Sequence, residues 1–267
     1  MRPPHPLFIL LLAACGTPAP PARPGTVVSL LPSWTEIIVD LGAADRLVGC
    51  TEACKPGRDV ARVPWQGSVE AIVRLRPALV IRQAPRAEGD GFGHALGAAG
   101  IRVLSLPSET VADVRAAIPS IGAALGVDAR AYLERFDREL AAAKAKGEGH
   151  GEPPTVLFVF GRDPGGVANV DAAGKGTFLD ELIRCAGGRN AVETGPYPKL
   201  RLEEIVRLAP EVIIDNAGPV DAWRAFPTVP AVRDGRVFAV PDNALLIPGP
   251  RLPRSVERLA EMIHGRP

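Results

Sequence analysis

Two similar segments, set on either side of a long helical pattern, constrain the fold of this chain more than any other feature. The first reads VEAIVRLRPALVI (residues 69–81) and the second reads LEEIVRLAPEVII (residues 202–214). Each predicts a short helix, a proline and an apolar strand. A solenoid needs at least three stacked units, so two copies favour two similar α/β lobes. The alternative is that helix, proline and strand recur here by chance.

The segment between the copies, residues 128–147, predicts one long helix. Asp128 suits the N-cap, Lys144 and Lys146 suit the negative end of the helix dipole, and Gly147 suits the stop. Apolar residues recur at helical spacing at Ala129, Tyr132, Leu133, Phe136, Leu140 and Ala143. A helix of this length spans roughly 28 Å at 1.5 Å per residue, which is enough to cross a small domain.

The remaining pattern is an alternation of strands and helices on both sides of that helix. We therefore expect an α/β fold with two lobes, mostly parallel sheets and one long rigid connecting helix. The predicted first lobe covers residues 26–126 and the second covers residues 153–267. In the second lobe, Thr177 is expected to cap a helix over residues 178–185. We reject a phosphate loop there, because Asn169 stands where that motif requires glycine.

The first residues have the features of an export signal rather than of a fold. Met1 and Arg2 are followed by an apolar run at residues 7–14, which is too short to span a bilayer. The ending LAAC resembles a bacterial lipobox, which implies removal of residues 1–14 and lipid modification of Cys15. Residues 15–25 then form a proline-rich tether. The alternative is an ordinary secretory signal with an incidental cysteine.

Composition and motifs exclude several function classes. A net charge of +1 argues against nucleic-acid binding and indicates no polybasic membrane patch, so we expect contact with the membrane through a lipid anchor only. The serine-hydrolase, zinc-protease and CxxC motifs are absent from the sequence, so we expect no enzyme and no catalytic residues. His94, His150 and His264 stand in separate contexts, which argues against a metal site.

Three cysteines remain beyond the signal: Cys50, Cys54 and Cys185. Cys50 and Cys54 are close enough in sequence for a small loop disulfide in an oxidising compartment. The alternative is that all three are free buried thiols. The sequence leaves the pairing open.

Residues 29–57, SLLPSWTEIIVDLGAADRLVGCTEACKPG, are followed by VPWQG and the first repeat. This succession resembles the first lobe of class III periplasmic substrate-binding proteins of ABC importers, notably the cobalamin- and siderophore-binding types. The resemblance runs from about residue 26 to residue 262. It implies a ligand cleft between the lobes, no cofactor, a permease dimer with ATPase subunits as partner, and a lipid-anchored position on the periplasmic side of the envelope.

The resemblance also implies a ligand. Cobalamin or a related corrinoid is the first expectation, and a ferric siderophore or haem is the alternative from the same family. An envelope enzyme or a structural lipoprotein is a more distant alternative. Two departures from the cobalamin pattern are Arg82-Gln83, where an aromatic is expected, and residues 245–247, which lack the expected acidic and aromatic side chains.

Three aromatic residues fall on family positions for cleft side chains: Trp65, Phe160 and Tyr197. Flat ligands are well matched by aromatic faces, which provide large apolar areas at small entropic cost. Phe160 also lies near a strand end, where open α/β sheets bind ligands. Core packing is the alternative for Trp65, and loop anchoring is the alternative for Tyr197. Arg251 opens the last helix, where it either faces an anionic group of the ligand or is solvated.

Glu70 and Glu203 occupy equivalent positions in the two repeats. The resemblance implies that such a pair docks into arginine pockets on the two permease subunits. The alternative is that each is a helix-start glutamate favoured by the helix dipole.

Overall fold

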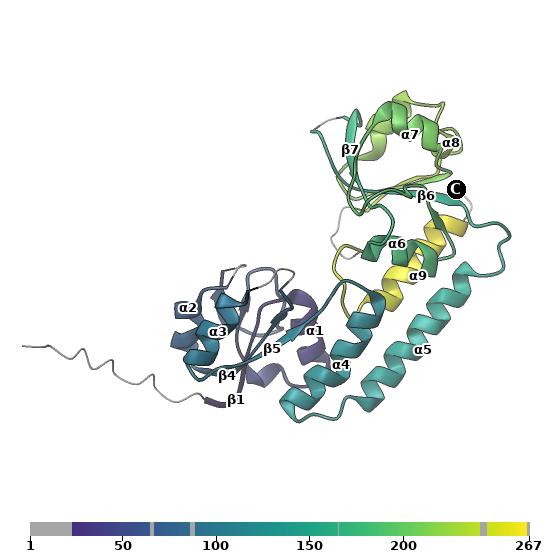
Figure 1. Ribbon diagram of the computed structural model, residues 1–267. Coiled ribbons are helices and arrows are strands. Elements are labelled where there is room, and N and C mark those ends of the chain that lie inside the picture. Colours follow the sequence, from purple (N-terminus) through teal and green to yellow (C-terminus); the bar gives the residue numbers. More distant parts are fainter. Residues whose placement is uncertain (1–22, 65–66, 86–88, 165, 241–244, 266–267) are drawn as a thin grey trace, which may run out of the picture.

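The computed structural model describes residues 23–64, 67–85, 89–164, 166–240 and 245–265. Its first lobe contains a five-stranded parallel sheet in the order β3-β2-β1-β4-β5 (Figure 1). The strands are β1 (Arg23–Ser29), β2 (Leu47–Thr51), β3 (Ala61–Val63), β4 (Pro77–Gln83) and β5 (Arg102–Leu106).

Helices cover both faces of this sheet because its strands are apolar on both sides. Val27, Leu79 and Ile81 pack in one core cluster with α1 (Pro32–Asp40) and α4 (Val111–Leu125). Val28 and Val80 point the other way and pack against α2 (Val69–Leu75) and α3 (Gly91–Ala98). This alternation follows from the two-residue period of a strand. The short 3-10 helix η1 (Ala44–Arg46) leads into β2.

The second lobe contains a mixed sheet in the order β11-β10-β6-β7-β9, with β8 paired to β6. Its strands are β6 (Thr155–Arg162), β7 (Asn169–Ala172), β8 (Arg189–Asn190), β9 (Lys199–Arg201), β10 (Val212–Asp215) and β11 (Val237–Ala239). Strand β7 runs antiparallel to both β6 and β9, whereas the other pairs are parallel. The helices are α6 (Phe178–Cys185), α7 (Leu202–Leu208), η2 (Val220–Ala225), α8 (Pro230–Arg233) and α9 (Leu252–His264).

The predicted connecting helix is present as α5 (Arg130–Gly147). Its N-cap is Ala129 rather than the expected Asp128, so the helix begins one residue later. The Asp128 carboxylate instead accepts the N–H of Arg130 at 3.0 Å. Near its start, the Tyr132 hydroxyl donates to Asp40 of the first lobe at 2.9 Å. Near its end, Lys146 pairs with Glu257 of α9. Helix α5 therefore joins the two lobes.

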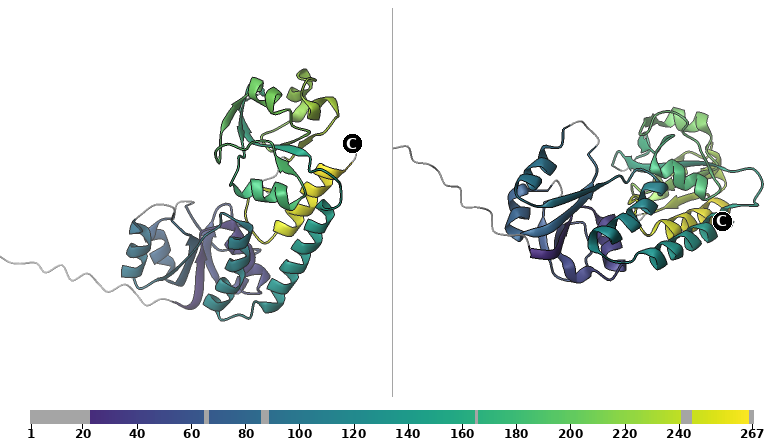
Figure 2. Two further views of the ribbon diagram at one scale, coloured as in Figure 1. Left: turned by 45° about the vertical axis from the view of Figure 1, so that its right-hand side comes forward. Right: turned by 60° about the horizontal axis from the view of Figure 1, so that its bottom comes forward.

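Helix α9 lies beside α5 in both views of Figure 2. Apolar side chains of α5, α9 and both sheets belong to one continuous core cluster. This packing makes the connection a pair of helices rather than a single one, which the sequence does not predict. Within the described residues, no helix combines the length and the apolar character that crossing a bilayer requires.

The two sequence repeats adopt the same local structure. Helices α2 and α7 each end at a residue with positive φ, Arg76 (φ 51°) and Ala209 (φ 46°), and each is followed by proline and a strand. The following proline disfavours the right-handed helical region for these residues, and the left-handed conformation ends each helix. Both following strands pair with the first strand of their lobe, β4 with β1 and β10 with β6. The two-lobe prediction is confirmed.

A buried ion pair links β6 to β10 in the second lobe. The Nε atom of Arg162 lies 3.0 Å from Oδ2 of Asp215, which also accepts the indole N–H of Trp223 at 2.8 Å. The side chains of Arg162 and Asp215 are 5% and 0% exposed. Removing one partner leaves an uncompensated buried charge.

We therefore expect Asp215→Ala to lower the free energy of unfolding by about 3–5 kcal/mol. Urea unfolding followed by circular dichroism measures the loss. Asp137→Ala is the matched control, because its ion pair with Arg115 is exposed and contributes little. An equal loss in both variants would show that the burial of the Arg162–Asp215 pair does not determine its contribution to the free energy of unfolding.

Candidate ligand-binding cleft

A pocket of about 440 Å³ lies between the two lobes. The first lobe lines it with residues at or after the carboxyl ends of four strands: Leu31, Pro32, Ser33, Ala53, Gln83, Ser108 and Glu109. The second lobe adds Phe160, Phe178, Leu179, Tyr197, Leu246, Ile247 and Pro248. Parallel strands present their carboxyl ends at one edge of a sheet, which is where open α/β sheets bind ligands.

Two of the predicted aromatics meet in this pocket. The rings of Phe160 and Tyr197 pack edge to face, with centroids 5.7 Å apart and an interplanar angle of 88°. Tyr197 is 55% exposed, the largest exposure recorded for a bulky apolar side chain in the described residues. Phe178, which no sequence motif indicates as a site residue, adds a third ring to the lining. An exposed aromatic at a pocket rim is available to a ligand.

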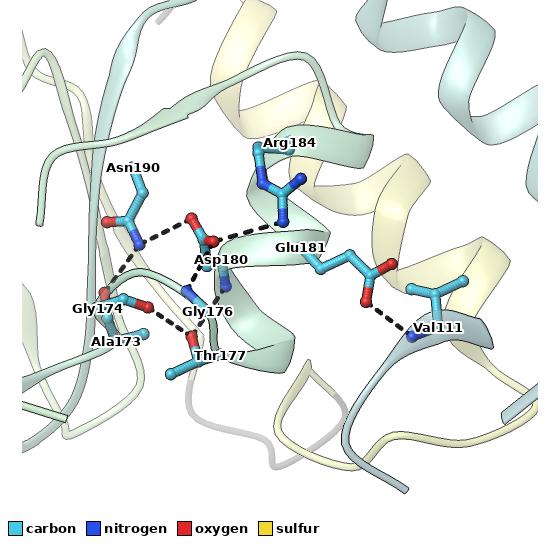
Figure 3. Close-up of polar contacts among 9 residues, drawn as sticks. All are labelled: Val111, Ala173, Gly174, Gly176, Thr177, Asp180, Glu181, Arg184 and Asn190. Carbon is cyan, nitrogen blue, oxygen red and sulfur yellow. Dashed lines mark hydrogen bonds and ion pairs between the residues drawn. The ribbon is translucent and has the colours of Figure 1, made fainter. Parts of the chain in front are cut away.

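The start of α6 is held in place by the polar contacts drawn in Figure 3. Thr177 caps the helix as predicted, since its hydroxyl accepts the N–H of Asp180 at 3.1 Å and donates to the carbonyl of Gly174. The Asp180 carboxylate accepts the N–H of Gly176 at 3.0 Å and the amide of Asn190 at 3.2 Å. This network orients Phe178 and Leu179 toward the pocket.

Two contacts cross from one lobe to the other beside the pocket. The Glu181 carboxylate of α6 accepts the N–H of Val111, the first residue of α4, at 2.8 Å (Figure 3). The guanidinium of Arg251 donates to the Glu36 carboxylate of α1, with Nε and Oε2 3.0 Å apart. Arg251 therefore does not line the pocket with Phe160 and Tyr197. It lines a separate hollow together with Glu36.

Several polar groups line the pocket without having been selected from the sequence. The Ser33 hydroxyl is buried and finds no hydrogen-bond partner among the described residues. The amide of Gln83 donates to Glu109 at 3.0 Å. Ser33 lies inside the first turn of α1, and its neighbour Trp34 is fully buried in the core. No motif marks these residues, because their position depends on strand ends that meet only in the folded chain.

The charge of the pocket is low. Among the described lining residues, Glu109 is the single Asp or Glu side chain, and none is a lysine, arginine or histidine. Arg82 stands close behind Gln83 but pairs with Asp90, donates to Ser105 at 2.9 Å and covers the Phe92 ring. The N–H of Gly93, followed by Arg82, lowers the pKa of Asp90, so this pair stays ionised.

Cys50, Cys54 and Cys185 are free thiols in the structure. Cys50 and Cys54 are buried on either side of Ala53, which lines the pocket. Burial raises the pKa of Cys50 to about 11, although Arg62 donates to its sulfur at 3.2 Å. The Cys50 thiol is therefore neutral at ordinary pH.

The other predicted site residues lie outside the pocket. Glu70 and Glu203 are exposed and occupy the second position of α2 and α7, which places them equivalently in the two lobes. Trp65 and Cys15 lie outside the described residues. In the part of the chain that the structure describes, no three His, Cys, Asp or Glu side chains gather into a metal site.

The described architecture matches known proteins. Residues 27–244 match the family model of periplasmic binding proteins. The chain belongs to this family. It is 31% identical over 259 residues to an uncharacterised ABC transporter substrate-binding lipoprotein, YvrC of Bacillus subtilis, covering 91% of this chain and 81% of that one. It is 29% identical over 269 residues to a cobalamin-binding protein of Halobacterium salinarum, covering 91% and 70%.

A solved structure of the periplasmic haem-binding protein BhuT, in complex with two haems, superposes with a TM-score of 0.77 at 30% identity. The match covers 90% of this chain and 97% of that one. The vitamin B12-binding protein BtuF of Vibrio cholerae has a TM-score of 0.72 at 21% identity, which shows the shared fold. The binding protein described here is thus an ABC transporter substrate-binding protein of the class III fold.

Proposed function

We propose that this binding protein captures cobalamin or a related corrinoid in the interlobe cleft and delivers it to the permease dimer of an ABC importer. The observation that carries this proposal is the chemistry of the pocket, which is apolar, aromatic and without a cation among its described lining residues. A corrinoid is a broad ring edged by uncharged amides. Such a ligand needs apolar faces and neutral hydrogen-bonding groups rather than charged ones.

The neutral polar groups support the same choice. Ser108 offers a hydroxyl and Gln83 offers an amide, each of which can donate to or accept from a ligand amide. A ligand larger than the pocket extends into the open part of the cleft.

Haem is the second candidate. Tyr197 favours it, because the exposed phenol stands over the pocket and a tyrosine oxygen can ligate haem iron. The likeness to BhuT at 30% identity also supports it. Against haem, its two carboxylates would meet Glu109 and no cation among the described lining residues. An anionic ferric siderophore would meet the same unfavourable charge.

A paired titration of residues 23–267 with cyanocobalamin and with haemin distinguishes the candidates. We expect one-to-one calorimetric binding of cyanocobalamin and, for Tyr197→Phe, an affinity within about threefold, because removal of an exposed hydroxyl costs little. Tight haemin binding, with an absorption spectrum that Tyr197→Phe changes, would identify haem rather than cobalamin as the ligand. The absence of binding to either ligand would reject both.

We further propose that the protein is held by a lipid on Cys15 at the periplasmic side of the envelope. The relative from Bacillus subtilis is named a lipoprotein, which supports this assignment. Mass spectrometry of the mature protein checks it: a lipidated chain beginning at Cys15 is expected, and an unmodified Cys15 contradicts it. No covalent chemistry on the ligand is part of the proposal.

A further inference from the structure

Arginines lie along the edge of the first sheet at which its strands begin. Strands β1 and β5 start with arginine, and arginine directly precedes β2 and β4, while β3 has one three residues upstream. We call these five residues the amino-edge arginines: Arg23, Arg46, Arg58, Arg76 and Arg102. The ligand pocket lies at the carboxyl ends of the same strands, so this edge is on the opposite side of the lobe.

Part of this edge is hollowed and basic. A depression of about 460 Å³ is lined by Arg23, Arg58 and the exposed Arg74 of α2, with Asp59 as the acidic residue of the lining. Arg23, Arg58 and Arg102 are exposed. Within the described residues, no ion pair is formed by Arg23, Arg58, Arg74, Arg76 or Arg102. Arg58 donates to the carbonyl of Ala44 at 3.4 Å, and Arg46 donates to that of Leu125.

The amino edge of the second-lobe sheet lacks such a row of arginines without ion-pair partners. Strand β6 starts with Thr155, and Glu211 precedes β10 and accepts from Thr155. Arg189 begins β8 but lies 3.9 Å from the carboxylate of Glu193, and Arg236 precedes β11 but donates to the carbonyl of Ile263. The arginine row is therefore specific to the lobe that follows the tether. The whole-chain charge of +1 does not reveal it, because acidic residues elsewhere balance these arginines.

The row lies where the tether enters the fold. Strand β1 begins at the lower edge of the first lobe in Figure 1. Its first residue, Arg23, stands eight residues after Cys15. Eight extended residues reach at most about 28 Å. A lipid on Cys15 would thus keep the amino edge close to the bilayer surface.

We propose that the amino edge of the first lobe docks on anionic lipid headgroups of the membrane that holds the anchor. The proximity of this surface to the bilayer depends on the proposed lipid anchor. Its attraction to anionic headgroups depends on the arginines alone. Arginine pairs with phosphate oxygens through two parallel N–H donors, so a row of arginines with no ion-pair partner in the described residues fits a phosphate-rich surface. Docking at this edge turns the ligand cleft and the start of α2, which carries Glu70, away from the bilayer, so this state precedes permease docking and does not coincide with it.

The test uses the non-lipidated mature chain, residues 16–267, which contains every described element. Its binding to phosphatidylcholine vesicles with and without phosphatidylglycerol is measured by co-sedimentation. We expect binding only to the anionic vesicles, weakened by added salt. Arg58→Gln, Arg74→Gln and Arg102→Gln together are expected to lower the apparent affinity roughly tenfold or more, since each basic residue near an anionic surface contributes several-fold.

The matched control replaces Arg184, Arg189 and Arg224, exposed arginines of the second lobe, by glutamine. It removes the same charge and is expected to leave vesicle binding unchanged. Equal weakening by the two triple variants, or equal binding to neutral vesicles, would overturn the inference. Cyanocobalamin titration of the same samples separates this result from the ligand proposal: unchanged ligand affinity with no vesicle binding rejects the membrane surface alone.

Discussion

Reversing the charge at both Glu70 and Glu203 is expected to abolish ligand uptake without changing ligand affinity. The two glutamates are exposed, occupy the same helix position in the two lobes, and stand on a rigid frame joined by α5 and α9. Two carboxylates with this pseudo-symmetric placement fit a two-fold permease. Loss of one partner of a buried interface charge pair costs about 2–5 kcal/mol, and reversal adds repulsion.

Cells that depend on the transported ligand for growth measure uptake, and calorimetry on the purified variant measures ligand affinity. Asp45→Lys with Glu193→Lys is the control, because it makes the same charge change at one exposed position in each lobe. Uptake that survives Glu70→Lys with Glu203→Lys would show that these residues do not dock the permease. Loss of uptake in the control as well would indicate a general charge effect.

The second large effect is expected from the cleft aromatics. Phe160→Ala combined with Tyr197→Ala removes two rings that contact each other and line the pocket. An aromatic side chain carries roughly 150–250 Å² of surface, and partial burial of two rings at about 25 cal/mol/Å² predicts a loss of affinity on the order of a hundredfold.

Calorimetric titration with cyanocobalamin measures this loss. Phe226→Ala is a suitable control, since this ring packs against the second-lobe core away from the pocket and is not part of its lining. Circular dichroism of each variant confirms that the fold is retained. An unchanged affinity in the double variant would move the ligand away from this pocket.

The sequence predicts those elements whose formation depends on local residue patterns. Helix α5 has an apolar stripe at helical spacing, and Gly147 is its last residue. The repeat predicts two lobes because proline, which disfavours helix at the preceding residue, follows both α2 and α7.

Other features depend on contacts between distant segments. Strands β7 and β9 are short and partly polar, and they become strands only by pairing antiparallel beside β6, so no local pattern marks them. Ser33 and Gln83 reach the pocket because strand ends converge there. Arg251 is recognisable as a helix-start residue, but its pairing with Glu36, far away in sequence, is not.

Amide hydrogen exchange of residues 23–267 with and without cyanocobalamin tests the central claim most directly. A ligand held in the interlobe cleft is expected to slow exchange at the segments around Ser33, Gln83, Phe160 and Tyr197. Exchange along the amino edge of the first lobe, around Arg58 and Arg102, is expected to stay the same. Protection confined to regions outside the cleft, or none at saturating ligand, would contradict this account of the site.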